Sequence, residues 1–158
     1  MHPLRVIAIP TPVADEVRRS SRSPFADHPT HTEVAAGHGP CRHCLRTFHV
    51  GEERRILFTY DSFSPLGAPP LPGPVFIHEA PCARYSEDGG TPRDLDGRTL
   101  TLNAYGRPRK LLVQGECRGD ELEDAAQRLF TRAAVDFIHV RDTEAGCYDF
   151  RLERAGAG

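Results

Sequence analysis

The chain has 158 residues, of which 39% are hydrophobic and 27% charged, a composition typical of one soluble globular domain with a core of ordinary size. The near balance of 20 basic and 22 acidic side chains, a formal charge of −2, gives no electrostatic basis for binding nucleic acid or an anionic membrane. No apolar stretch has the length of a signal peptide or of a membrane-spanning helix. We therefore expect a cytoplasmic protein whose five cysteines stay reduced.

The first 40 residues divide into a short ordered segment and a loop. Residues 4–9 are apolar and predict a strand, and Thr11-Pro12 is typical of a helix start, with threonine as the cap and proline at the first helical position. Residues 20–40 are poor in large apolar side chains and rich in Ser, Pro, His and Gly. We therefore expect a strand and a two-turn helix over residues 1–19, followed by a flexible loop over residues 20–40 that contributes little to the core.

The main domain is expected over residues 41–154, within a single-domain protein, and contains one strongly amphipathic helix. Apolar side chains recur at helical spacing over residues 121–133, Asp120 is a suitable N-cap, and Glu123 completes a capping box. Short apolar or alternating segments predict strands at residues 55–58, 75–78, 98–105, 110–113, 135–141 and 147–153. The sequence therefore predicts an α+β fold: a mainly antiparallel sheet, one long helix packed on it in the C-terminal half, and a flexible N-terminal segment.

The strongest chemical motif is Cys41-Arg42-His43-Cys44. Two cysteines at this spacing can present two thiolates to one tetrahedral Zn²⁺. A closed site needs two further ligands, which His78 with Cys82, or Cys82 with Cys147, could supply. We take Cys41, Cys44, His78 and Cys82 as the predicted metal site, with Zn²⁺ as the ion. The alternative is that the thiols are reduced and carry no metal, with His78 simply ending a strand.

The same motif also permits a redox interpretation, because Arg42 and His43 could stabilise a thiolate. Thioredoxin-like sites, however, lie where a strand leads into a helix. Here Gly39-Pro40 precedes the motif, and no alternation of strands and helices surrounds it. The redox interpretation is therefore kept as an alternative to the zinc site.

Residues 135–153 form a predicted hairpin that carries a second group of reactive side chains. If its turn places Arg141 opposite Cys147, then His139 faces Asp149, and the four side chains project from one face of the sheet. Cysteine, histidine and aspartate on one face resemble a nucleophile, a base and an orienting group, so the catalytic candidates are Cys147, His139, Asp149 and Arg141. The alternative is a solvated polar face, and a register slip of one residue would change the partners.

A succession of short motifs resembles one known family. In chain order they are Cys41-Arg42-His43-Cys44-Leu45-Arg46, Gly51-Glu52, Pro74-Val75-Phe76-Ile77-His78-Glu79, Cys82-Ala83-Arg84-Tyr85, Ile138-His139-Val140-Arg141 and Gly146-Cys147-Tyr148. The series is similar to the bacterial family with domain of unknown function 1203, over roughly residues 41–153. The resemblance implies fold boundaries and brings no established activity. Members of that family often carry a second cysteine in the closing motif, as Cys-Tyr-x-Cys-Arg, and this chain has Phe150 at that position.

The cysteine and histidine cluster is thus the expected functional feature of a small bacterial protein. The first hypothesis is a non-enzymatic binding module whose zinc organises the loop that begins at Cys41. The alternative is a cysteine-dependent enzyme or a thiol-redox protein that uses Cys147 or the Cys41/Cys44 pair. A third hypothesis is a small interaction protein in which all cysteines are structural. We expect neither nucleic acid nor membrane as a partner, and the sequence names no substrate.

Overall fold

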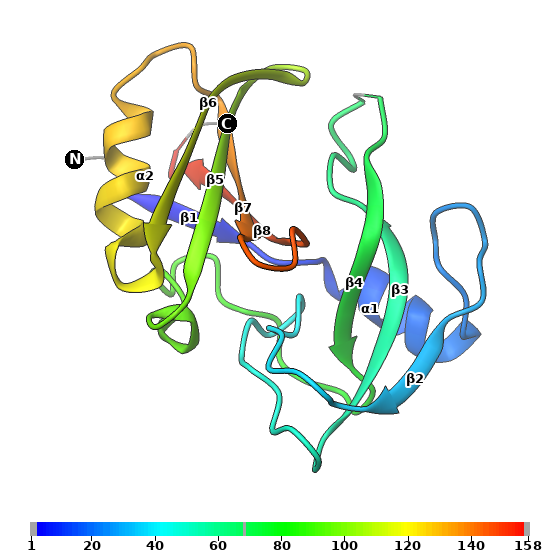
Figure 1. Ribbon diagram of the computed structural model, residues 1–158. Helices are drawn as coiled ribbons and strands as arrows, with labels where there is room; N and C mark the ends of the chain where they lie inside the picture. The colour runs from blue at the N-terminus through cyan, green and yellow to red at the C-terminus, as the bar shows by residue number, and fades with distance from the viewer. Residues whose placement is uncertain (1–2, 68, 157–158) are drawn as a thin grey trace.

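The computed structural model describes residues 3–67 and 69–156, which form two antiparallel sheets side by side and two short α-helices (Figure 1). The strands are β1 (Leu4–Ile7), β2 (His31–Val34), β3 (Arg54–Asp61), β4 (Pro72–His78), β5 (Thr99–Gly106), β6 (Lys110–Arg118), β7 (Phe137–Asp142) and β8 (Tyr148–Arg154). The helices are α1 (Thr11–Ser20) and α2 (Leu122–Phe130). The predicted antiparallel sheet is confirmed, but the fold is largely β and contains no long helix among the residues described.

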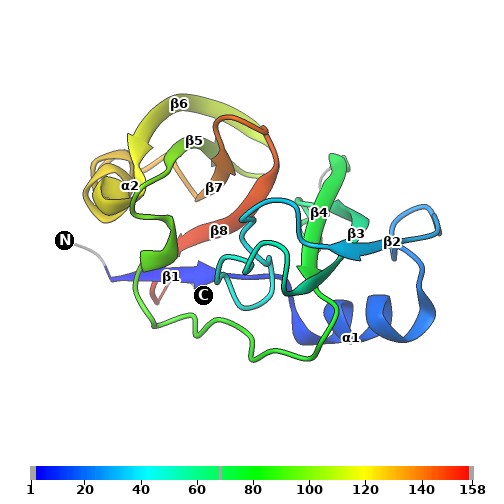
Figure 2. The same ribbon diagram turned by 60° about the horizontal axis from the view of Figure 1, so that its bottom comes forward.

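The larger sheet has the strand order β1-β8-β7-β5-β6, and the smaller one has the order β2-β3-β4. Strand β1 joins the larger sheet at its edge, where Val6 pairs with Leu152 of β8, so the two ends of the described chain lie together. The N-terminal strand predicted over residues 4–9 is present over Leu4–Ile7. Figure 2 shows α2 against the larger sheet and α1 beside the smaller one. Each sheet therefore has a helix of its own.

The helix predicted over residues 121–133 ends earlier than expected, at Phe130. The cause lies in the last strand. The Arg154 guanidinium donates hydrogen bonds to the carbonyl oxygens of Phe130, Arg132 and Val135, at 2.7, 3.1 and 2.7 Å. These bonds satisfy carbonyl groups that the end of a helix leaves unpaired, and they turn the chain toward the sheet.

The start of this helix also differs from the predicted capping box of Asp120 and Glu123. A 3-10 turn, Gly119–Glu121, leads directly into α2. The Glu121 carboxylate accepts the backbone N–H of Arg118 at 3.2 Å, while Asp120 pairs with the Arg118 guanidinium at 3.1 Å. The capping carboxylate is therefore Glu121, because the helical segment begins earlier than the apolar pattern indicates.

Residues 3–40 contain more secondary structure than predicted. Helix α1 begins at Thr11, one residue before the predicted first helical position Pro12, so Pro10 is its N-cap and no side chain caps it. Residues 20–40, expected to be a loop throughout, contain β2, in which Val34 pairs with Arg54 of β3. Ala35 follows β2 and is buried in the core. Pairing with β3 stabilises a strand here that the sequence pattern does not indicate.

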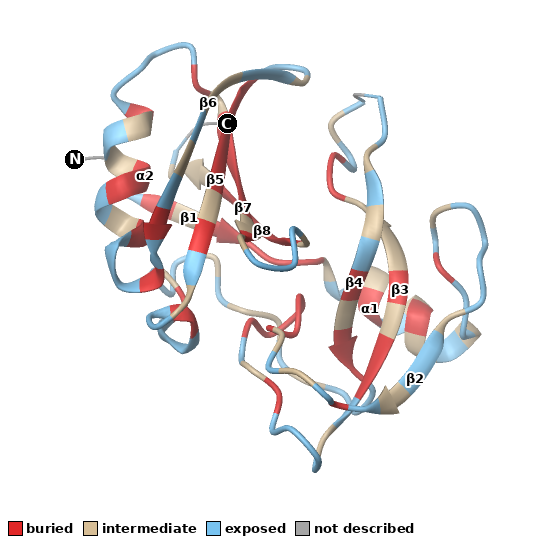
Figure 3. Ribbon diagram, viewed as in Figure 1, coloured by how far each residue is buried: buried red, intermediate tan, exposed pale blue. Residues whose placement is uncertain are grey.

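The two halves bury separate apolar cores (Figure 3). The first core lies between the larger sheet and α2, and includes Leu102, Val140, Leu152, Leu122 and Phe130. The second packs α1 and the smaller sheet around the Cys41 segment, and includes Val17, Phe58, Ile77, Cys41 and Cys44. A third, aromatic cluster contains Phe63, Tyr105 and Phe137. The cysteine motif thus belongs to the core of the smaller half.

Among the residues that the structure describes, no helix combines the length and the apolar character that crossing a membrane requires.

Candidate metal centre

The Cys41–Cys44 segment forms a tight turn in the long connection between β2 and β3. The Leu45 N–H donates to the Cys41 carbonyl at 2.8 Å, and the Cys41 N–H donates to the Arg46 carbonyl at 3.0 Å. Leu45 closes the turn with a φ of 60°, a left-handed conformation that costs a residue with a side chain about 1–2 kcal/mol. The turn places both cysteines in the interior, where each is buried.

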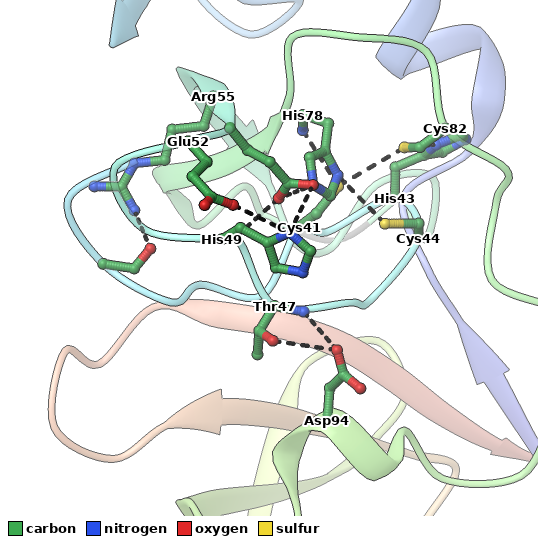
Figure 4. Close-up of polar contacts among 12 residues, drawn as sticks. Cys41, His43, Cys44, Thr47, His49, Glu52, Arg55, His78, Cys82 and Asp94 are labelled. Atoms are coloured by element: carbon green, nitrogen blue, oxygen red, sulfur yellow. Dashed lines mark hydrogen bonds and ion pairs between the residues drawn. The ribbon is translucent and has the colours of Figure 1, made fainter. Parts of the chain in front are cut away.

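His78 and Cys82 reach the same place from the smaller sheet. His78 ends β4, and its backbone N–H donates to the Cys41 sulfur at 3.3 Å. The sulfurs of Cys41 and Cys82 lie 3.9 Å apart, and the Cys44 sulfur lies 3.4 Å from His78 Nδ1 (Figure 4). One ligand atom from each of the four residues lies within 4.8 Å of the other three. Two segments of the chain, residues 41–44 and 78–82, therefore converge on one point.

The His78 ring is held by a carboxylate and an aromatic ring. Its Nε2 lies 2.9 Å from Glu53 Oε2, and its ring centroid lies 4.6 Å from that of Phe48. When Nε2 carries the proton donated to Glu53, Nδ1 presents its lone pair to the cluster. Gly39 makes this packing possible, because with a φ of +90° a Cβ there would lie 2.6 Å from the Phe48 ring. The turn, the ring and the carboxylate thus fix the orientation of His78.

Cys82 is the one member of the cluster that is only partly buried, and it has two nitrogen neighbours. Arg18 of α1 donates from Nη2 to the Cys82 sulfur at 3.3 Å, and from Nε to the His78 carbonyl at 3.1 Å. His43 Nδ1 lies 3.2 Å from the same sulfur, and its Nε2 lies 2.9 Å from the Thr11 hydroxyl. The predicted helix cap Thr11 therefore contacts His43, which in turn contacts the cluster.

The protonation of the cluster follows from burial and hydrogen bonding. Burial raises the pKa of the Cys41 thiol. Hydrogen bonds from Cys41 and Cys44 hold the pKa of Cys82 well below its ordinary value. Hydrogen bonding to Cys44 is the main cause that raises the pKa of His78 to about 10. These shifts favour a thiolate at Cys82 and a proton on His78, and a metal that binds His78 Nδ1 would displace a proton from its ring.

All four cluster residues lie within a stretch, residues 38–154, that matches one family model. The chain belongs to the family described as protein of unknown function (DUF1203). The match confirms the resemblance drawn from the series of short motifs. Searches of the curated proteins and of the solved structures find no match to this chain. Helix α1, which contributes Thr11 and Arg18, lies outside the residues that match this family.

The terminal hairpin does not have the predicted register. We expected Arg141 opposite Cys147 and His139 opposite Asp149, and this prediction is wrong. The observed pairs are Val140 with Phe150, His139 with Arg151, and Arg141 with Tyr148. The register shifts between Val140 and Arg141, which is the irregularity of a β-bulge. A bulge inserts an extra residue in one strand, so a regular alternation fails to place the side chains beyond it.

The catalytic candidates lie in different surroundings. His139 is fully buried, and rings of Phe63, Tyr105, Phe137 and Tyr148 surround it at centroid distances of 4.6, 5.2, 5.3 and 5.0 Å. Neither of its ring nitrogens has a hydrogen-bond partner, and burial lowers its pKa to about 2. Cys147 is partly exposed, and its sulfur contacts the Ala145 carbonyl at 3.9 Å. Among the residues described, no hydrogen bond joins the Cys147 sulfur to His139.

Arg141 and Cys147 line one pocket beside β4, whereas Asp149 lies apart from it in the interior. Asp149 is fully buried and forms an ion pair with Arg42 at 3.1 Å, in a geometry that makes no hydrogen bond. Burial raises the pKa of Asp149 to about 7, although Arg42 opposes this. The Arg141 guanidinium bonds the Gly146 carbonyl at 3.4 Å. The assignment of these four residues to catalysis stays a prediction, and no described contact assembles a nucleophile with its base.

The partners that orient the cluster could not be recognised from the sequence. Glu53 looks like part of a turn after Gly51, Arg18 like one of several surface arginines, and Thr11 like a helix cap. His43 is the exception, because it lies inside the cysteine motif itself. The other three reach the cluster only through the packing of α1 and the β3–β4 pair.

Proposed function

We propose that Cys41, Cys44, His78 and Cys82 bind one Zn²⁺ as a closed structural centre, and that the protein is a non-enzymatic module organised by this metal. The observation that carries the proposal is the convergence of four donor atoms within 4.8 Å of one another. Three thiolates and one imidazole are a donor set that selects Zn²⁺ among the common divalent cations, and four protein ligands complete its tetrahedron.

The spacing of the donors supports this fit. Bonds of about 2.3 Å from sulfur to Zn²⁺ in tetrahedral geometry require sulfurs about 3.5–4 Å apart. The Cys41 and Cys82 sulfurs are 3.9 Å apart, and the Cys44 sulfur is 3.4 Å from His78 Nδ1. The contact between His78 Nε2 and Glu53 is the usual second partner of a metal-bound imidazole. A complete set of protein ligands leaves no position for a substrate, which favours a structural role over a catalytic one.

The centre would connect the two halves of the molecule through the Cys41 loop. The Arg42 guanidinium donates to the Tyr148 carbonyl of β8 at 2.8 Å and pairs with Asp149. The Thr47 backbone N–H donates to Asp94 at 2.8 Å, just before β5. A metal that holds this loop to β4 through His78 therefore fixes contacts between the smaller sheet and the larger one.

A thiol-redox role is the second candidate, and one distance favours it. The sulfurs of Cys41 and Cys82 are close enough to approach a disulfide after a small movement. Burial raises the pKa of Cys41, which makes it a poor nucleophile, so only Cys82 could begin such a reaction. A redox protein would be isolated with free thiols and without bound zinc, so metal content separates the two candidates.

The test is zinc analysis of protein purified without a histidine tag, with cysteine variants as a matched set. We expect about one zinc per chain in the unaltered protein, as four protein ligands imply. Cys44→Ser and Cys82→Ser should lose most of it. Cys147→Ser is the control, because this partly exposed cysteine lies outside the cluster and should keep its zinc. Metal-free wild-type protein after refolding with excess zinc, or equal zinc in all variants, would overturn the proposal.

A further inference from the structure

The four proposed ligands are unequally protected. Cys41, Cys44 and His78 are 0%, 5% and 7% exposed, whereas Cys82 lies in the intermediate class. Any reagent or competing chelator that attacks the centre from solvent would therefore meet the Cys82 sulfur first. What surrounds that sulfur decides how easily the centre can be opened.

Arg18 covers Cys82 from α1. Its side chain is only 12% exposed, although it lies on the first helix and carries a charge. One guanidinium nitrogen donates to the Cys82 sulfur at 3.3 Å, and a second donates to the His78 carbonyl at 3.1 Å. The planar fork of arginine thus spans the segment between two proposed ligands, a geometry that lysine cannot reproduce.

His43 approaches the same sulfur from inside the motif. A metal-bound thiolate can only accept hydrogen bonds, so His43 Nδ1, 3.2 Å from the sulfur, must carry the proton. Nε2 then accepts the hydroxyl proton of Thr11 at 2.9 Å. His43 is 1% exposed, so this tautomer is fixed by two partners in a buried setting. Thr11, the first residue of α1, therefore helps to hold the ring with Nδ1 toward Cys82.

We propose that α1 is the outer shell of the metal centre: Arg18 and the Thr11–His43 pair hold the Cys82 thiolate and protect it from electrophiles and from metal exchange. This inference rests on the proposed zinc site. Two sets of contacts support it independently. Arg18 donates hydrogen bonds to the Cys82 sulfur and the His78 carbonyl, and His43 lies between the Thr11 hydroxyl and the Cys82 sulfur. Both depend on a helix that lies outside residues 38–154, so a segment beyond the family match tunes a site within it.

Hydrogen bonds to the Cys82 sulfur would lower its reactivity toward electrophiles. Two N–H donors occupy lone pairs of the sulfur that would otherwise attack an electrophile. With N-ethylmaleimide as the probe, an S–C bond forms, the Zn–S bond breaks, and the other alkene carbon takes a proton from water. A ligand lost in this way opens the centre, and the zinc passes to a chelator. Removal of a donor should speed this sequence without changing the four ligands.

The experiment uses the full-length zinc-loaded chain, N-ethylmaleimide and a chromogenic zinc chelator. Arg18→Met keeps most of the aliphatic stem and should release zinc about tenfold faster, the lower end of the effect expected for outer-shell partners of a metal. The rate of zinc release from Arg18→Lys should lie between those of the wild-type protein and Arg18→Met. Arg19→Met is the matched control, because Arg19 lies on the same helix, is 73% exposed, and pairs with Glu16. It should release zinc at the wild-type rate.

Peptide mapping of the alkylated protein separates protection from general loosening. Cys82 should be alkylated faster in Arg18→Met, while alkylation of Cys147 should not change, since that cysteine lies outside the cluster, just before β8. Thr11→Val acts through His43 with almost no change of shape, and should also speed alkylation of Cys82. If Arg18→Met does not fold, Thr11→Val alone tests whether α1 protects Cys82.

Each remaining result has a defined meaning. If wild-type protein binds zinc and both variants release it at the wild-type rate, the outer shell does not exist and the metal site stands. A parallel rise in Cys147 alkylation would show that α1 only stabilises the fold, and would overturn the protective role. If wild-type protein binds no zinc, the proposed function fails and this inference fails with it.

Discussion

The two buried strand histidines, His78 and His139, have opposite surroundings. His78 lies in the smaller half, with one ring nitrogen 3.4 Å from the Cys44 sulfur and the other 2.9 Å from Glu53. His139 lies in the larger half among aromatic rings, and neither ring nitrogen has a partner. Hydrogen bonding to Cys44 raises the pKa of His78 to about 10, and burial lowers that of His139 to about 2.

This contrast teaches that burial alone does not make a histidine functional. Both residues were candidates from the sequence, one as a ligand and one as a base. Convergent donor groups distinguish them, because a ligand or a base acts through its ring nitrogens and needs groups placed to receive them. His139 instead serves the aromatic core as a flat, neutral ring.

The largest effect should follow loss of the metal at His78. An excess of a strong chelator should lower the free energy of unfolding by at least about 4 kcal/mol, the linkage expected when a ligand is present at about 1,000 times its Kd. His78→Ala should bind little zinc and should respond weakly to the chelator. His139→Leu, its counterpart in the other half, should retain zinc and the full response. Denaturant unfolding with and without chelator measures the response of each protein. Identical unfolding curves for the wild-type protein in the two conditions would contradict the assignment of His78 as a metal ligand.

The next effect concerns acid and His139. Its folded pKa, about 2, lies below its unfolded value near 6.5, so the unfolded chain takes up the proton first as the pH falls. The stability that His139 contributes is therefore complete above pH 6.5. It is lost toward pH 2 at up to about 1.4 kcal/mol per pH unit.

His139→Leu should remove this loss, because leucine has a similar volume, suits the aromatic cluster and cannot be protonated. The measurement is the difference in unfolding free energy between variant and wild type at pH 7.5 and at pH 5. Acid effects on the metal ligands are common to both proteins and cancel in this difference. The unfolding free energy of the variant minus that of the wild type should be about 2 kcal/mol larger at pH 5 than at pH 7.5. A difference that does not vary with pH would show that His139 has the same pKa in the folded protein as in the unfolded chain.

Local patterns in the sequence predicted much of the fold, and long-range contacts explain the rest. The alternation in β5 and the apolar face of α2 depend on neighbours along the chain, and both elements are present. The end of α2 at Phe130 depends on Arg154, from a distant strand. Strand β2 has exposed and partly exposed side chains, so no pattern marks it, and it pairs only because β3 lies beside it.

The candidate site divides in the same way. The spacing of Cys41 and Cys44 is local, and it indicated two ligands that a single turn could present. Whether Cys82 joined His78 or Cys147 was a question of tertiary packing, and the structure brings His78 to the cluster. The register shift between Val140 and Arg141 breaks the alternation from which a catalytic face was inferred. A bulge has no signal in this sequence, since no glycine stands at the shift.

The smallest expected effect tests the carboxylate that His78 has and His139 lacks. Glu53→Gln keeps the shape of the side chain but weakens the acceptor for His78 Nε2, now 2.9 Å away. Loss of such a partner typically weakens metal binding 10- to 100-fold, so the zinc Kd should rise about tenfold, or about 1.4 kcal/mol. Glu52→Gln is the matched control, because this neighbour is exposed and pairs only weakly, with His49 at 3.9 Å. Competition titrations against a chelator of known affinity measure both variants. Equal zinc affinity in the two variants would mean that Phe48 and the strand alone fix the position of His78, and that the Glu53 carboxylate does not contribute to zinc binding.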